Sequence, residues 1–548
     1  MGRIPIGDSV VGERTVMDDS CSFGELAAHL DHLTDTDPGE ALRQARALSL
    51  EGANRLNMMQ LRAATLVNAG VQCQQQDAIN DGLTLYRELH SQYPTPDTVF
   101  NLGTAIVSSI GYSPDGAEWL VHKESTKHLR SEARACFWSV AQDAEAGASA
   151  RTQSWTNLAN QFADSQRLSE SHDARLAALA LDQKNGVAAH GAARYLIYCY
   201  QMGLCSDLAI LEAAAHAKVA RDNRDRIIEY AGLQAADGML SFLNRFQEPP
   251  PRAPHNDPFV SWVEQERLTL GPTVELVDPE MGKLDWLRLP GILERETGKG
   301  ATPPPIFAMF NQMKGDFILA RDLAWRSRDE AGWPSSGCFD DTLDYAVYGP
   351  ATSALILAHR TAIDLLDKVA AAANHYFELG LKPHEIFFGK IWRLRTKKEG
   401  QSPLTSEVES IVRSGVRALY GLVELADDYE ARGGILRPLK NLRNVGTHRF
   451  VVLHDLGDIT QCRRAAEVEH HDFDRFAAMV TEALRVARSA IQMLALAVSE
   501  HEELLIESKD VISTLEVFDH EWIRGRGDAL KSDDSDDVDE IDQPPEPC

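Results

Sequence analysis

The first half of the chain repeats itself, and this constrains the fold more than any other feature of the sequence. The segment TLVNAG at residues 65–70 returns 33 residues later as TVFNLG at 98–103, and after an insertion as SWTNLA at 154–159. Periods of about 34 residues are typical of helix pairs that bury their apolar faces only against neighbouring pairs. We therefore predict an α-helical solenoid over residues 22–245. Solenoids present extended surfaces, so we expect a protein partner or trigger to bind there. The alternative is that the array only orients or dimerises the C-terminal domain.

Prolines interrupt the chain after the repeats. Residues 246–305 contain PPPRAP near their start and end with PPP. Proline breaks regular helices, so this stretch is predicted to be a connector. From 306 to 510, apolar residues recur every three or four positions, which predicts helices. We expect an all-α chain, with an extension at 1–21 and a C-terminal bundle of five helices without strands at 306–326, 340–379, 404–431, 438–454 and 472–503.

The net charge of −27 over 548 residues limits what the chain can bind. Affinity for phosphates comes from cations, so any nucleic-acid site has to be local. Residues 531–548 contain eight acidic residues and one lysine, and such composition predicts a disordered tail at 511–548. This tail is either a solubilising end or a mimic of RNA that screens a basic site. In the second case, deleting 531–548 would raise the affinity for RNA.

Cysteine usage and hydropathy indicate the compartment. Eight cysteines are scattered without a CxxC pair, which favours reduced thiols in the cytosol. No apolar run is long enough to cross a bilayer, and the N-terminus lacks the apolar segment of a signal peptide. We expect a cytoplasmic protein that does not contact membranes.

One short stretch reverses the acidic character of the chain. Residues 432–449 contain five arginines or lysines and no acidic residue, and Arg443, Asn444 and His448 stand within it. An imidazole titrates near neutral pH and can move a proton. A guanidinium keeps its charge and can hold a phosphate with two hydrogen bonds. This combination is suited to cutting RNA without a metal.

The spacing of these three residues adds a geometric condition. On a helix, Asn444 and His448 are four positions apart and share a face, so Asn444 is placed to orient the imidazole. Arg443 and His448 are five positions apart, or roughly 140° of rotation. Arg443 can therefore join the site only if the helix distorts, for example at Gly446, or if two protomers combine their residues. The second possibility favours a symmetric homodimer.

The stretch resembles the signature of the HEPN superfamily, which consists of helical bundles marked by an arginine, a polar residue and then a histidine. The resemblance covers about 305–510 and includes the segments 366–377 and 387–392, as in HEPN proteins fused to tetratricopeptide-like repeats. It implies a dimeric, metal-independent endoribonuclease of phage-defence or toxin systems. It also implies that His448 moves a proton while the ribose 2'-hydroxyl attacks the phosphate and Arg443 stabilises the phosphoryl charge. The products would carry 2',3'-cyclic phosphate and 5'-hydroxyl ends.

Further residues are candidates for this site. Asp367 lies on the predicted second helix and is either a buried carboxylate aimed at the site or a partner for Lys368 or a nearby arginine. The candidate RNA contacts are basic residues beside the motif and upstream of it: Arg437, Lys440, Arg449, Arg393 and Arg395.

No cofactor is expected, and a metal site is not favoured. The one cluster with metal-binding side chains contains Glu467, Glu469, His470, His471 and Asp472. Adjacent histidines usually point in different directions, and acidic residues at this place favour the start of the following helix. The alternative to the ribonuclease is a non-catalytic scaffold in which both halves bind protein and the bundle dimerises.

Overall fold

The computed structural model describes most of the chain. The described residues are 4, 20–52, 54–111, 114–205, 208–243, 257–271, 285, 287–292, 303–329, 332–333, 337–394, 402–456, 459–462 and 465–507. Within these ranges, the side chains at 20–22, 208, 240, 243, 443–448, 461 and 507 are not described. The predicted acidic tail and most of the predicted connector therefore lie outside the described residues.

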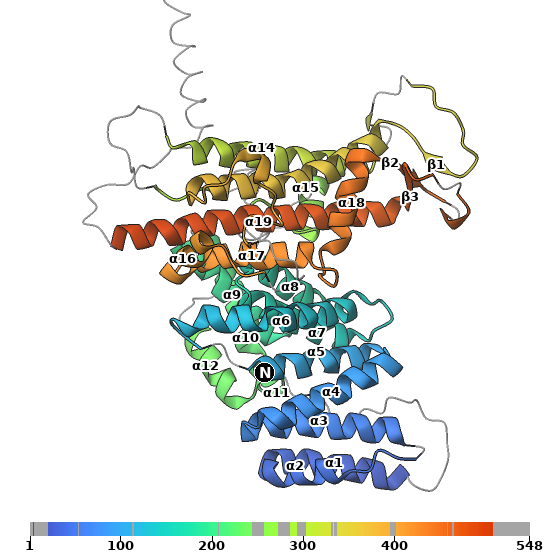
Figure 1. The fold of residues 1–548 in the computed structure, drawn as a ribbon, viewed down its shortest axis with the longest axis vertical. Coiled ribbons are helices and arrows are strands. Elements are labelled where there is room, and N and C mark those ends of the chain that lie inside the picture. Colours follow the sequence, from blue (N-terminus) through green and yellow to red (C-terminus); the bar gives the residue numbers. More distant parts are fainter. Residues whose placement is uncertain are drawn as a thin grey trace, which may run out of the picture.

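The N-terminal half is a stack of helices that runs from α1 and α2 at one end of the molecule towards the C-terminal half (Figure 1). Its helices are α1 (Ser20–Thr36), α2 (Pro38–Ala47), α3 (Arg55–Cys73), α4 (Gln76–Gln92), α5 (Pro96–Ile110), α6 (Glu118–Gln142), α7 (Ala148–Asp164), α8 (Leu168–Leu181), α9 (Gly186–Gln201), α10 (Leu208–Asp222), α11 (Arg224–Ala231) and α12 (Leu233–Leu243). Consecutive helices from α3 to α10 pack in pairs, which is consistent with helical repeats.

The repeated sequence motif has a packing reason. Its copies lie in the first helix of successive pairs, α3, α5 and α7. A Cβ atom on Gly70 would lie 2.9 Å from the Ile79 side chain in α4, and one on Gly103 would lie 3.0 Å from Phe137 in α6. The first two copies have glycine because the second helix of the pair approaches the first helix closely at this position, whereas the third copy has Ala159 there.

The C-terminal half is also mainly helical. Its helices are α13 (Pro258–Gln265), α14 (Pro305–Arg326), α15 (Pro350–Tyr376), α16 (Ser406–Ser414), α17 (Arg417–Glu430), α18 (Arg437–His448) and α19 (Phe473–Glu507), with short 3-10 turns η3 (Pro383–Glu385) and η4 (Ile459–Gln461). The helices α14, α15 and α19 pack along one another, and α17 lies between α19 and the repeats (Figure 1). The prediction of an all-α chain is confirmed.

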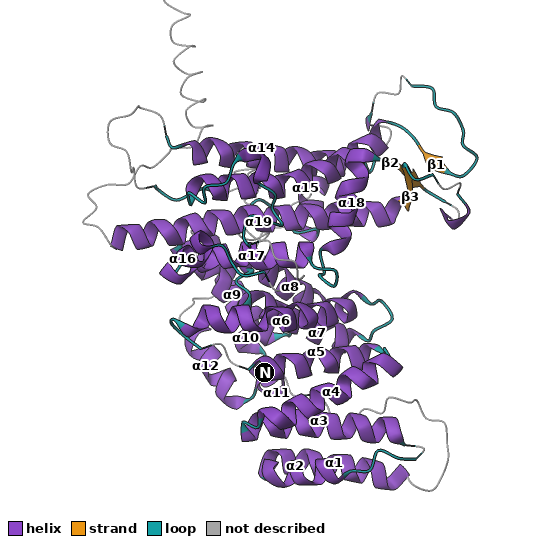
Figure 2. Ribbon diagram, in the orientation of Figure 1, coloured by secondary structure: helices purple, strands orange, loops and turns teal. Residues whose placement is uncertain are grey.

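A small sheet is the exception, and it corrects the prediction of a bundle without strands. Its strands are β1 (Ala346–Val347), β2 (Phe450–His454) and β3 (Val468–Asp472), in the order β1-β2-β3. The first pair is antiparallel and the second is parallel. The predicted helix at 438–454 is therefore wrong beyond His448. Residues 450–453 read Phe-Val-Val-Leu, and aromatic and β-branched residues favour strands. Figure 2 shows the sheet beyond the ends of the long helices.

The predicted helix at 404–431 is divided in two. Gly415 has a φ of 122°, a conformation that favours glycine, and it ends α16 before α17 begins at Arg417. This single residue turns the chain between the two helices.

One large apolar core joins the two halves. It includes Trp119 and Leu120 of α6 and Tyr195 of α9 together with the inner faces of α14, α15, α17 and α19. The described part of the connector belongs to the same core through Trp262 and Leu268. Within the described residues, no helix combines the length and the apolar character that a membrane span requires.

Candidate active site

The helix that carries the predicted motif, α18, is held by an apolar face. Leu439 and Leu442 of the helix are buried and lie three positions apart, and Leu436 immediately before the helix is buried as well, so one side of α18 lies against the core. The helix packs against α15 and α17 and leads directly into β2. Both ends of α18 are therefore fixed by ordered structure.

The predicted catalytic residues lie in the second half of α18. The backbone at Arg443, Asn444 and His448 is helical, so Asn444 and His448 are one turn apart, and Arg443 and His448 are five positions apart. The side chains of these three residues are not described. The helix that the sequence predicted at these positions is confirmed, while the catalytic roles stay predictions.

Acidic residues form ion pairs with the basic residues beside the motif and reduce the local positive charge. Lys440 forms an ion pair with Glu430 at the end of α17, and the Arg437 guanidinium donates a hydrogen bond to the Glu430 backbone carbonyl. Arg449 lies 2.7 Å from Glu469 on β3. The sequence shows no acid between residues 432 and 449, but the fold brings acids from neighbouring elements. The local positive charge is therefore smaller than the sequence suggests.

Asp367 is connected to α18 through the segment after η3. Its Oδ1 accepts a hydrogen bond of 2.8 Å from the backbone N–H of Phe388. The Phe388 ring contacts the ring of Tyr429, and the ammonium of Lys440 lies 6.0 Å above that same ring. The upstream segments of the predicted pattern thus converge on the first half of α18. This hydrogen bond positions the segment, and a direct part of Asp367 in the site stays a prediction.

Arg393 lies elsewhere. Its guanidinium binds Asp427 of α17 and Glu124 of α6 through pairs of hydrogen bonds between 2.6 and 3.0 Å, and its side chain is 11% exposed. It connects the repeats to the bundle, so the geometry does not favour an RNA contact at this position. Arg395, the neighbouring candidate, lies outside the described residues.

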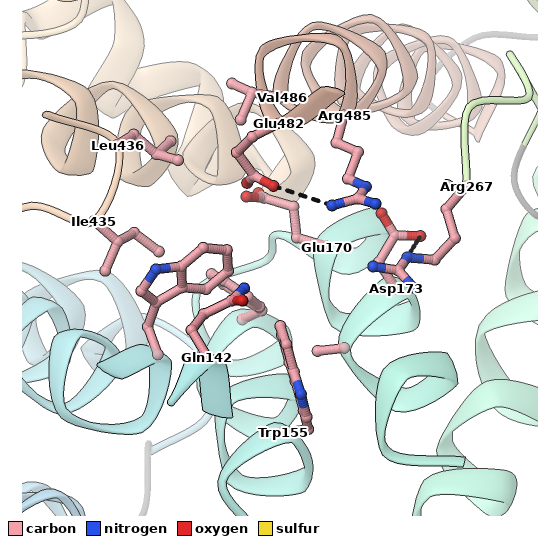
Figure 3. A pocket seen from close by; sticks show the side chains of 13 residues that line it. Gln142, Trp155, Glu170, Asp173, Arg267, Ile435, Leu436, Glu482, Arg485 and Val486 are labelled. Carbon is pink, nitrogen blue, oxygen red and sulfur yellow. Dashed lines mark hydrogen bonds and ion pairs between the residues drawn. The ribbon is translucent and has the colours of Figure 1, made fainter. Parts of the chain in front are cut away.

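A pocket at the junction of the two halves was not anticipated from the sequence. Trp138 and Trp155 line it from the repeats, and Ile435 and Leu436 close another side immediately before α18. Figure 3 shows Glu482 and Arg485 of α19 facing Glu170 and Asp173 of α8 across the pocket. Its wall combines residues of α6, α7 and α8 with Arg267, the two residues before α18 and α19. The first and last of these parts of the chain are separated by more than about three hundred positions, so no local pattern could have indicated the pocket.

Fold and site together define a class of protein: an array of helix pairs joined through a shared core to a C-terminal helical domain with an Arg-Asn-x3-His helix. The comparison with protein families identifies that domain. Residues 297–501 match the family described as LA2681-like HEPN, and this part of the chain is a HEPN domain. No curated protein and no solved structure matched the chain.

Proposed function

We propose that the HEPN domain is a metal-independent endoribonuclease that gives 2',3'-cyclic phosphate and 5'-hydroxyl ends. The observation that carries the proposal is that Arg443, Asn444 and His448 fall in α18 of a domain that matches a HEPN family. His448 would move the proton of the ribose 2'-hydroxyl or of the leaving 5'-oxygen. Arg443 would stabilise the charge that builds on the phosphoryl oxygens, and Asn444 would orient the imidazole.

The test compares the wild type with Arg443→Ala and His448→Ala on total cellular RNA, with and without EDTA. Matched controls are Arg413→Ala and His384→Ala, which change exposed residues of the same domain away from α18. We expect cyclic-phosphate ends from the wild type and the controls and a loss of at least about 100-fold in both motif variants. DNA of the same sequence should resist, because it lacks the 2'-hydroxyl. Fragments with other ends, or equal cleavage by His448→Ala, would refute the proposal.

A homodimer is part of this proposal, and the surface beside the motif helix supports it. Five large apolar side chains are between 56 and 86% exposed on and beside the small sheet: Phe339, Leu343, Tyr345, Phe450 and Leu456. Exposed apolar groups that gather in one region mark protein contacts. We expect a dimer mass by light scattering and a monomer mass for Phe450→Glu. Tyr93→Glu, a comparable change on the repeats, should leave the dimer intact.

We also propose that the repeats sense a trigger, in phage defence or in a toxin-like system. The junction pocket supports this, because residues of the repeats and the two residues before α18 line the same pocket. A change in the repeats would therefore reach α18 through the walls of this pocket. We expect Trp155→Ala to reduce activation by lysate of phage-infected cells without changing the basal cleavage rate. Equal activation of both proteins would argue against this route.

A non-catalytic scaffold is the second candidate. The net charge of −27 and the acidic partners of Lys440 and Arg449 favour it, because they weaken the attraction for RNA. A folded, dimeric wild type that leaves RNA intact in the presence of lysate would support the scaffold.

A further inference from the structure

Four side chains with metal-binding atoms meet at the sheet. They are Asp344 before β1, His454 at the end of β2, Cys462 after η4 and His470 in β3. One ligand atom from each residue lies within 4.8 Å of the ligand atoms of the other three. The four residues are spread over more than a hundred positions in the sequence, and the sheet brings them together.

The strand register selects which histidine takes part. In the parallel pair, His454 is opposite Asp472 and Val452 is opposite His470. Paired residues of neighbouring strands point to the same face, so His454 shares a face with Asp472. Asp472 and His470 are two positions apart on β3 and share a face as well, so His470 and His454 lie on the same face of the sheet. His471 points to the other face, where its ring lies 5.7 Å from that of Phe476. The expectation that the two adjacent histidines point in different directions is met.

The hydrogen bonds of His454 fix which of its nitrogens has a lone pair. Its Nδ1 lies 2.9 Å from the backbone carbonyl oxygen of Asp344. A carbonyl only accepts, so Nδ1 carries the proton and Nε2 presents a lone pair. That Nε2 lies 2.8 Å from Nδ1 of His470 and 4.0 Å from Sγ of Cys462. A histidine that donates one N–H to a carbonyl and turns the other nitrogen towards a cluster of donors has the usual arrangement of a metal ligand.

The carboxylate of Asp344 is also held in place by hydrogen bonds. The Thr342 hydroxyl donates a hydrogen bond of 2.6 Å to Oδ1 of Asp344, and the backbone N–H of Ala346 donates a second one of 3.3 Å. These two bonds orient the carboxylate. A carboxylate and a thiolate together supply two negative charges, which balance a divalent cation.

The donor set identifies the class of cation. Two imidazoles, one thiolate and one carboxylate are ligands of zinc, whereas magnesium and calcium take oxygen ligands almost entirely. In tetrahedral coordination with Zn–N bonds of about 2.0 Å, two nitrogens lie about 3.3 Å apart. The two histidine nitrogens would have to separate by about 0.5 Å from their hydrogen-bonded distance. A small rotation of the half-buried His470 ring provides this separation. Zinc binding would also displace the proton that lies between the two nitrogens, because both nitrogens have to present lone pairs to the metal.

We propose that Asp344, His454, Cys462 and His470 form a structural zinc site that holds the sheet together. Such a site would join β1, the η4 turn and β3 to β2, and β2 follows α18 after a single residue. The metal would thereby fix the end of the helix that carries the HEPN motif. The proposal is independent of RNA cleavage, because metal content is measured without RNA.

The first test is the metal content of the full-length protein, purified without chelator. We expect about one zinc per chain in the wild type, from the four ligands above. Cys462→Ala and His470→Ala should lose it, while Cys338→Ala and His471→Ala, a free exposed thiol and the adjacent histidine, should keep it. Folded wild type with far less than one zinc, or zinc that persists in both ligand variants, would overturn the proposal.

A second measurement tests the site even if the ligand variants fold poorly, because it uses the wild type. Cobalt(II) added to the wild type after zinc removal should give the thiolate-to-cobalt charge-transfer band and the strong visible bands of tetrahedral coordination. Cys338→Ala should show the same spectrum, and Cys462→Ala should lose the charge-transfer band. Zinc should also raise the melting temperature of the zinc-depleted wild type and leave that of Cys462→Ala unchanged. If the wild type shows neither these bands nor a response of its melting temperature to zinc, the four side chains only form hydrogen bonds and the proposal is wrong.

Discussion

Arg134 of α6 and Asp428 of α17 form a two-pronged ion pair in which both side chains are fully buried. Nε of the arginine lies 2.8 Å from Oδ2, and Nη2 lies 3.0 Å from Oδ1. Arg167 binds the same carboxylate, and Arg130 pairs with Glu424 one turn earlier in α17. The helical repeats and the HEPN domain are therefore joined by charges that water does not reach.

Replacing Asp428 by alanine should destabilise the protein strongly. The change leaves Arg134 and Arg167 buried without their shared carboxylate, and breaking a buried pair in this way costs about 3–5 kcal/mol. The free energy of unfolding in urea measures the loss. The control is Glu132→Ala, which breaks an exposed pair with Arg87 and should cost less than about 1 kcal/mol. Similar small losses for both variants would show that the buried network contributes little to stability.

Glu500 makes stability depend on pH. Its carboxyl group accepts hydrogen bonds of 2.7 Å from the N–H of Ala418 and from the hydroxyl of Tyr198, and burial raises the pKa of Glu500 to about 7. The unfolded value is about 4.3, so the folded state binds the proton more tightly. This contribution is complete below the unfolded pKa and is lost as the pH rises from about 4 to about 7.

We therefore expect Glu500→Gln, which cannot titrate, to show a smaller decrease in melting temperature from about pH 5 to about pH 8 than the wild type. Thermal unfolding at several pH values measures the slopes. The control, Glu503→Gln, changes an exposed residue of the same helix and should keep the wild-type slope. Parallel curves for the wild type and Glu500→Gln would contradict the assignment.

Periodicity predicted the helical elements of this fold because it reports which side of a segment is buried. It placed α14 and α19 within a few residues of their observed ends. It could not distinguish the end of α18 from β2, because 449–454 is a short apolar run compatible with both structures. The strand forms because β3 pairs with it, and β3 begins 18 residues after β2 begins.

The candidate site divides in the same way. Local spacing correctly predicted that Arg443, Asn444 and His448 lie in one helix, while their catalytic roles stay predictions. It was not sufficient for Arg393, whose partners Glu124 and Asp427 come from α6 and α17. Ion pairs between distant segments depend on tertiary packing, and a single sequence does not show which segments pack together.

Arg449 provides a test of RNA contact that is separate from catalysis. Its side chain is 50% exposed beside the motif and is paired with Glu469. In the His448→Ala background, which should not cleave the RNA, Arg449→Ala should weaken binding of single-stranded RNA and lower the slope of log affinity against log salt by about 0.7. Fluorescence anisotropy over a range of salt concentrations measures this slope. Arg413→Ala, which removes an exposed arginine paired with Glu409 on α16, should leave the slope unchanged. Equal slopes in all three proteins would exclude a phosphate contact at Arg449.

Mixing two inactive variants tests whether the active site is shared between protomers. Arg443 and His448 are five positions apart on α18, so a regular helix turns them towards different sides. If one protomer supplies the arginine and its partner the histidine, a heterodimer of Arg443→Ala and His448→Ala contains one site with both residues intact. Random pairing should then restore about a quarter of the wild-type sites. The rate at which cyclic-phosphate ends form after co-expression of the two chains measures this recovery, and each variant expressed alone provides the background. A mixture that stays inactive, while light scattering shows heterodimers, would place both residues of each site in one protomer and require a local distortion of α18.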